Sequence, residues 1–236
     1  MKQKFNQYRP VWVTLLVTLV LAWLSLLPEY HVPGLQNAIS NAALNYSFRT
    51  QETAETVQQQ KVSGNWIVTY RRLDRSWERG AVVFEQGWNG LWRPILTTSI
   101  ENYPMDLLHL REGDRTHDVL YAVDCPPEAA CWDVVPSAGV LYGEGQIDPQ
   151  DAHPITERSF ILEIESVPHD TRLGIFDADG HELPTLYPGS GSMGTSGSVC
   201  KPICILILLA GAAVALVRFV RLRRKAQTLR QEADEA

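Results

Sequence analysis

Two of the four cysteines are close enough in the sequence to form a local disulfide. Cys125 and Cys131 flank a short segment that begins with two prolines. Because exported compartments oxidise neighbouring thiols, this spacing predicts a structural disulfide, worth about 2 kcal/mol in the chain-entropy model. A metal site here would need two further ligands at regular spacing, and the neighbouring sequence supplies none.

Tryptophans are the second group with a chemical use. Five of them lie in the middle of the chain, at Trp66, Trp77, Trp88, Trp92 and Trp132. Exposed indoles can stack on a glycan or a peptide, whereas a β domain of this size also needs aromatic residues in its core. The alternation of Trp66, Val68 and Tyr70 fits a buried face. We therefore expect any ligand platform at Trp88 and Trp92.

One acidic segment has the spacing of a calcium loop. Asp177, Asp179 and Glu182 place carboxylates at its first, third and sixth positions. An EF-hand loop also needs a distal bidentate glutamate, which the following residues do not provide. An Asp-Gly turn between two strands explains the same residues, so the sequence predicts no metal site.

The sequence gives little sign of catalysis. It contains no GxSxG or P-loop pattern, and its six histidines form no HExxH motif. Glu163 and Glu165 alternate along one strand face, which favours solvation over acid–base work. We therefore predict no cofactor and no catalytic residues.

The two ends of the chain are apolar. Residues 11–27 carry no charge and would span about 25 Å as a helix, slightly less than the roughly 30 Å of a bilayer core. Residues 199–218 form a second candidate span, on which Gly211, Ala212 and Ala215 provide a small surface for close helix packing. Cys200 and Cys204 share one face of this helix as packing residues. A basic start also fits a signal peptide, but no small-x-small cleavage site follows, so we expect an uncleaved anchor.

Charge orients these spans. The segment 28–198 carries 11 Lys or Arg and 24 Asp or Glu, a net charge of −13, whereas basic residues precede the first span and follow the second. By the positive-inside rule, both termini are cytoplasmic and the middle is periplasmic or extracellular. The basic tail is placed to contact anionic lipid, and the overall charge of −6 argues against a nucleic-acid partner.

The expected fold is a membrane-anchored α+β protein, with two transmembrane helices flanking an exported, mainly antiparallel, sandwich-like β domain preceded by a helix. Alternating apolar residues predict strands at 65–71, 80–86, 94–101, 118–123, 131–135, 139–142, 159–165 and 172–176. Asn-Gly at Asn89 predicts a tight turn. The expected organisation is 1–10 cytoplasmic start, 11–27 span, 28–61 linker and spacer helix, 62–187 β domain, 188–198 flexible Gly/Ser linker, 199–218 span and 219–236 basic cytoplasmic tail.

These features predict an interaction or scaffold subunit of a two-pass inner-membrane or envelope complex, with other subunits and the lipid bilayer as its partners. The alternatives are a membrane-tethered enzyme acting on envelope polymers and an extracytoplasmic sensor module. Clustered polar residues in a cleft would favour the enzyme. A closed aromatic core with an exposed sheet edge would favour the interaction subunit.

Overall fold

The computed structural model describes residues 8–33, 54–75, 78–101, 103–112, 115–136, 145–164, 167–168, 171–183, 189–194 and 198–234. The chain divides into two compact units. The first, the helical unit, comprises the described residues of Met1–His31, Gly87–Leu91 and Gly197–Ala236. The second, the β domain, comprises those of Val32–Gln86 and Trp92–Ser196.

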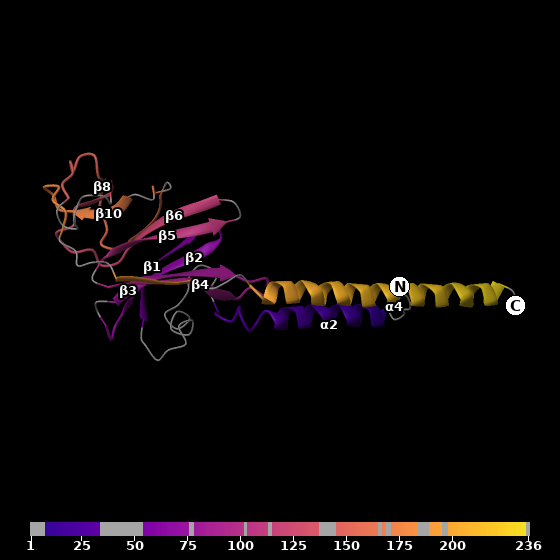
Figure 1. Cartoon of the computed structure of the whole chain (residues 1–236). Helices are drawn as coiled ribbons and strands as arrows, with labels where there is room; N and C mark the ends of the chain where they lie inside the picture. Colours follow the sequence, from indigo (N-terminus) through magenta and orange to yellow (C-terminus); the bar gives the residue numbers. More distant parts are fainter. Residues whose placement is uncertain are drawn as a thin grey trace. The chain divides into compact units, whose positions relative to one another are not determined.

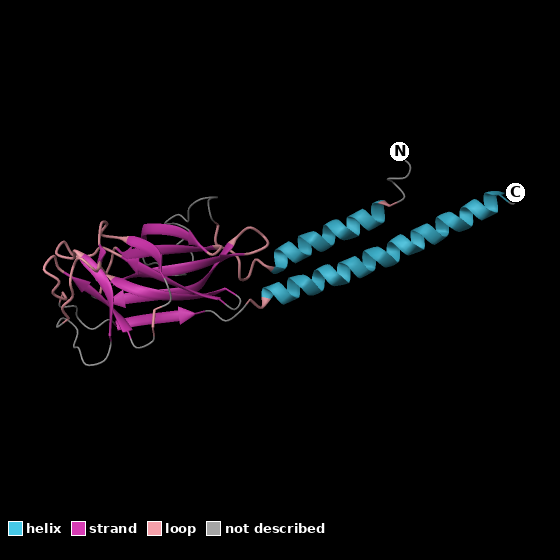
Figure 2. Ribbon diagram, turned by 90° about the horizontal axis from the view of Figure 1, so that it is seen from above, coloured by secondary structure: helices cyan, strands magenta, loops and turns pink. Residues whose placement is uncertain are grey.

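Two helices form the helical unit and lie side by side (Figure 1, Figure 2). Helix α2 covers Arg9–Ser25, with Pro10 in its first turn, and α4 covers Cys200–Asp234. At the start of α4, the Ser198 hydroxyl accepts a hydrogen bond from the Lys201 N–H at 3.1 Å, the geometry of an N-cap. The Glu29 carboxylate accepts from the N–H groups of Val199 and Cys200 at 2.8 and 3.1 Å, favourably placed at the positive end of the helix dipole.

Helix α4 is long and apolar enough to cross a membrane. Within residues 200–228, an 18-residue window has a mean hydropathy of 2.7, and only 11% of that window is buried. Helix α2 is also apolar, but its 17 residues are fewer than a typical span requires. The structure therefore supports one candidate span by length and composition, while the two-helix prediction rests on the sequence.

A five-stranded antiparallel sheet forms the first layer of the β domain, in the order β1-β2-β3-β4-β11. Its strands are β1 (Ala54–Val62), β2 (Asn65–Arg72), β3 (Glu78–Gln86), β4 (Trp92–Glu101) and β11 (Gly189–Gly194). The β1–β2 turn consists of Ser63 and Gly64, which both have positive φ, 46° and 79°. This is the backbone of a two-residue hairpin turn that matches the twist of its strands.

Two three-stranded antiparallel sheets complete the domain, in the orders β5-β6-β9 and β10-β7-β8. The strands are β5 (Met105–Glu112), β6 (Arg115–Ala122), β7 (Cys131–Pro136), β8 (His153–Pro154), β9 (Phe160–Ile164) and β10 (Thr171–Phe176). One face of the β5-β6-β9 sheet, including Leu108 and Val119, packs on Ile67 and Val83 of the five-stranded sheet. Its other face, including Leu120, packs with residues of β7 and β10. The β5-β6-β9 sheet is therefore the middle layer.

The α+β class and the antiparallel sheets are confirmed, and most of the predicted strands appear within a residue or two of their predicted bounds. The predicted strand at 139–142 lies outside the described residues. The sequence analysis missed β1, β5, β8 and β11.

Two predicted segments are wrong where the structure describes them. Residues 54–61, the end of the predicted spacer helix, are part of β1, because hydrogen bonding to β2 overrides a helix-favouring composition. The earlier part of that predicted helix lies outside the described residues. Residues 189–194 of the predicted flexible linker form β11, which pairs with Leu96–Glu101 of β4.

Candidate functional site

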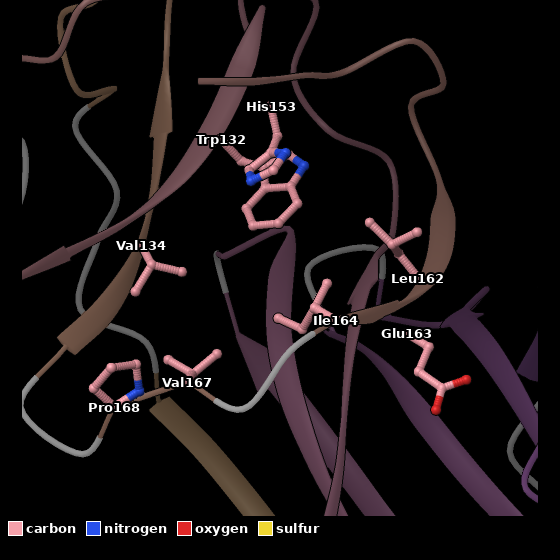
Figure 3. Close-up of a pocket in the computed structure, with 8 residues that line it drawn as sticks. All are labelled: Trp132, Val134, His153, Leu162, Glu163, Ile164, Val167 and Pro168. Carbon is pink, nitrogen blue, oxygen red and sulfur yellow. The ribbon is translucent and has the colours of Figure 1, made fainter. Parts of the chain in front are cut away.

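An apolar pocket of about 420 Å³ opens between the middle sheet and the β10-β7-β8 sheet. This volume falls in the range of about 300 to 1,000 Å³ typical of ligand pockets. Figure 3 shows its eight lining residues, Trp132, Val134, His153, Leu162, Glu163, Ile164, Val167 and Pro168.

Two stacked rings form one side of the pocket. The Trp132 and His153 rings have centroids 4.4 Å apart and planes 19° from parallel (Figure 3). The β7–β8 register causes this contact, because it places these two residues directly opposite each other. Trp132 is buried, whereas His153 is exposed. The buried Trp132 ring therefore anchors the stack in the domain, and the His153 ring is the side of the stack that contacts solvent.

Strand β9 supplies the opposite side. Leu162 and Ile164 alternate with Glu163, so the two aliphatic side chains face the pocket while Glu163 points away from the other lining side chains (Figure 3). The Glu163 carboxylate lies 2.9 Å from Nδ1 of His117. Leu162 is 43% exposed, and β9 is the last strand of its sheet among the described residues. The pocket therefore adjoins a sheet edge.

A histidine–carboxylate pair lies behind the rim of the pocket. Asp118 is 2% exposed; its Oδ1 lies 2.7 Å from Nδ1 of His109, and its Oδ2 accepts a hydrogen bond from the Val167 N–H at 2.8 Å. The second bond holds Val167 at the rim. A buried carboxylate that orients an imidazole is half of a general-base arrangement. In the described part of the chain, no serine, threonine or cysteine side chain hydrogen-bonds to His109.

A second polar network lies on the opposite face of the middle sheet. The Tyr121 hydroxyl lies 2.7 Å from Oγ1 of Thr98 and donates to Oδ2 of Asp106 at 3.4 Å. Burial raises the pKa of Asp106 and raises that of Tyr121 well above its usual value. The network joins β4 to β5 and β6 among aliphatic core residues, away from the pocket, so we assign it a structural role.

The predicted disulfide is wrong, since Cys125 and Cys131 are both free, buried thiols. Two hydrogen bonds hold Cys125 to Arg158. The Cys125 N–H donates to the Arg158 carbonyl at 2.7 Å, and Nε of Arg158 donates to the Cys125 carbonyl at 2.8 Å. Cys131 begins β7, and its thiol is 3.9 Å from the Asp177 carbonyl. Separate partners thus hold the two residues despite their short spacing. Burial raises the pKa of the Cys125 thiol to about 11, which suppresses its thiolate at neutral pH.

The two tryptophans predicted to bind a ligand have different environments. Trp92 is 5% exposed and packs edge-on against Trp66 with ring centroids 6.5 Å apart. Trp88 is 61% exposed in the turn between β3 and β4. They therefore do not form a shared stacking platform. The tryptophan that lines the pocket is Trp132, which the sequence analysis did not select. Its stacking partner His153 lies on a strand of only two residues, which is too short to show a strand pattern in the sequence.

The acidic segment forms a turn. Candidate ligand atoms of Asp177, Asp179 and His181 lie within 4.8 Å of one another. However, Oδ1 of Asp177 already accepts the N–H groups of Asp179 and His181, both at 2.9 Å. Those hydrogen bonds, with that to His181 the strongest, lower the pKa of Asp177. Glu182 is buried against Arg172, and Gly180 has the positive φ of the predicted Asp-Gly turn.

The small residues of α4 pack against α2 in part. A Cβ atom on Gly211 would come within 2.1 Å of the Thr18 hydroxyl oxygen, so only glycine allows the observed approach. Ala215 is 5% exposed, and Ala212 lies in an apolar groove that includes Trp12. We refer to the contact made by Thr18, Ala22, Cys200, Cys204, Gly211 and Ala215 as the helix seam.

The chain was compared with known proteins by sequence and by structure. No protein-family model, no curated protein and no solved structure matches it.

Proposed function

We propose that this chain is a two-pass membrane protein whose exported β domain binds an extended, apolar segment of another membrane or envelope protein. The observation that carries the proposal is the apolar pocket beside the β9 edge. Its lining is aliphatic and aromatic, and its polar neighbours hold the rim in place. This arrangement supports binding better than catalysis.

Edge strands and adjacent pockets cooperate in peptide recognition. An added strand gains main-chain hydrogen bonds along the edge, while a pocket selects alternate side chains. In this domain, Leu162 and Ile164 lie on the strand that would receive the segment and also line the pocket. A partner with a large apolar side chain at one position of an extended segment fits both features.

The membrane part of the proposal is supported by the exposed surface of the helical unit. On α2, Leu16, Leu19 and Trp12 are 63%, 59% and 56% exposed, and on α4 the exposed side chains through Val217 are similarly apolar. Thr18, Gly211 and Ala215 lie in the helix seam instead, whereas Ala212 and Ala213 are exposed. Apolar residues outside and small residues inside are the arrangement expected of paired helices in lipid.

Topology is the first prediction. Alkaline phosphatase fused after Ser198 is expected to be active and the same enzyme fused after Ala236 inactive, because it forms its disulfides only outside the cytoplasm. Activity is measured in intact cells and normalised to fusion protein abundance. Equal activity at the two positions would contradict a second crossing by α4, and activity only at Ala236 would reverse the proposed orientation.

Partner binding is the second prediction. Leu162→Arg is expected to weaken capture of the partner about 30-fold or more, because a charge in the pocket costs about 2 kcal/mol or more when it cannot be paired. A photoreactive phenylalanine analogue at position 162 should give a discrete cross-linked adduct in cells. The measurement is the amount of cross-linked adduct formed from position 162. It is compared between the otherwise native chain and chains that also carry a substitution at another pocket residue.

Leu73 provides the matched control, because it is the same residue type, 62% exposed, in the turn after β2. Leu73→Arg should leave capture unchanged, and the photoreactive residue at position 73 should give no adduct. Identical adducts at positions 73 and 162 would refute the binding site. If His109→Gln abolished turnover of an envelope polymer while Leu162→Arg had no effect, the enzyme hypothesis would replace it, with the His109–Asp118 pair as its base.

A further inference from the structure

The turn between β3 and β4 belongs to the helical unit. This segment, Gly87–Leu91, is called the tryptophan loop below. The Asn89 side-chain amide donates to the Tyr30 carbonyl at 3.1 Å, and the Trp23 indole N–H donates to the Asn89 carbonyl at 3.3 Å. Leu91 packs with Leu26 and Tyr30. The loop is thus held against the end of α2 by hydrogen bonds and by apolar contact.

Close packing reinforces this attachment. A Cβ atom on Gly87 would lie 2.6 Å from the ring of Tyr30, which is fully buried. Asn89 also accepts the Leu91 N–H through its side chain at 3.2 Å, and Gly90 has a φ of 78°. The Gly87 N–H donates to the Leu91 carbonyl at 2.8 Å, so residues 88–90 form a tight turn that includes the predicted Asn89-Gly90 signal.

Charged residues mark the end of the apolar helix surface at the level of the loop. Glu29 caps the start of α4, and the Lys201 ammonium lies 5.7 Å from the centre of the Tyr30 ring. These charges end the apolar surface of the helix pair. Because Asn89 bonds to Trp23 and Tyr30, the tryptophan loop lies at the same level, at the charged end of this apolar surface.

Helix length supplies an independent reason for contact with lipid at this level. The 17 residues of α2 extend about 25 Å, several ångströms less than a bilayer core of roughly 30 Å. A short span is accommodated when flanking residues with amphipathic side chains lie in the interface. Trp23 and Trp88 are 45% and 61% exposed, and indole rings favour this zone.

From this packing, depth and exposure, we propose that Trp88 is a lipid-interface anchor: the tryptophan loop enters the outer headgroup region of the bilayer beside the helix pair. The partner is the lipid surface, and the inference rests on the proposed membrane insertion of α2 and α4. Trp88 is the most exposed of the described tryptophans, whereas Trp92 is buried. The two therefore cannot bind a ligand together, and contact with lipid gives Trp88 a role of its own.

The native cysteines make a direct test possible. All four are buried, so Trp88→Cys introduces the only exposed thiol and can carry an environment-sensitive fluorophore. The full-length protein is reconstituted into phosphatidylcholine vesicles containing phosphatidylglycerol. We expect blue-shifted emission from position 88, several-fold weaker quenching by aqueous iodide than at Leu73→Cys, and quenching by lipids brominated near the headgroup.

Trp12→Cys separates this inference from the proposed function. A label there should be shielded from iodide and quenched by lipids brominated in the upper acyl chain, because Trp12 is exposed on α2 one turn from its start. If position 12 is in lipid and position 88 behaves like position 73, the anchor is refuted while membrane insertion stands. If position 12 is itself accessible to iodide, the insertion of α2 is refuted and the anchor with it. Labelled Trp88→Cys must retain the secondary structure of the native chain, measured by circular dichroism.

Discussion

Glu182→Gln is expected to destabilise the β domain by about 3 to 5 kcal/mol, a large part of the roughly 5 to 15 kcal/mol that stabilises a typical domain. The Arg172 and Glu182 side chains are 8% and 1% exposed and form a two-pronged ion pair, with Nη2 and Oε2 2.8 Å apart. Glutamine keeps the shape of the side chain and removes its charge. The buried Arg172 guanidinium then loses the negative charge of Glu182.

The position of Glu182 adds to the effect. Its Oε2 also accepts the Gly145 N–H at 2.9 Å, and its own backbone N–H donates to the Gly145 carbonyl at 2.8 Å. It therefore joins the segment at Gly145 to β10 through Arg172. Thermal unfolding of the full-length protein in detergent, followed by the circular dichroism of the strands, measures the loss.

An exposed pair of the same chemistry provides the control. Arg71 and Glu55 are also an arginine and a glutamate, 2.9 Å apart, but their side chains are 44% and 37% exposed. Glu55→Gln should cost less than about 1 kcal/mol, because solvent screens both charges. The double variant Arg172→Met, Glu182→Leu should recover much of the stability lost in Glu182→Gln. Equal losses for Glu55→Gln and Glu182→Gln would contradict burial as the cause.

The strands of the five-stranded sheet differ in how well the sequence predicts them. Strands β2, β3 and β4 carry alternating or continuous apolar residues, such as Ile67 and Val83, and were identified from that pattern. Strand β1 carries Gln58, Gln59 and Gln60, which favour a helix locally, and only its pairing with β2 makes it extended. The Ser63-Gly64 dipeptide is a turn signal for this hairpin that the sequence analysis did not use.

The middle layer and the pocket depend on tertiary structure. Strand β5 has Leu107 packed on one face and Leu108 on the other, because its sheet is covered on both sides, and this removes the alternation that marks a half-buried strand. The pocket joins Trp132 to His153 and both to Leu162, which no local spacing indicates. The disulfide prediction from cysteine spacing was wrong for the same reason, since Arg158, distant in the sequence, holds Cys125 in place.

The helix seam gives the second large expected effect. Gly211→Ala should loosen the pairing of α2 and α4, and Gly211→Leu should disrupt it further, because an added Cβ would lie 2.1 Å from Oγ1 and 2.2 Å from Cγ2 of Thr18. Thr18 has little freedom to move, since its hydroxyl donates to the Thr14 carbonyl at 2.8 Å. Alanine is favoured over glycine in a helix by about 1 kcal/mol, so a loss on Gly211→Ala would oppose intrinsic propensity and isolate the packing.

Cys200 reports on this pairing without an added probe. It is 8% exposed in the seam at the start of α4, where a maleimide dissolved in water reaches it only when the helices separate. In detergent micelles, Gly211→Leu should increase its alkylation rate about tenfold or more, which corresponds to about 1.4 kcal/mol of lost pairing. Ala213→Leu is the control, because Ala213 is exposed on the same helix. An unchanged rate in Gly211→Leu, or the same increase in Ala213→Leu, would show that Gly211 does not hold the two helices together.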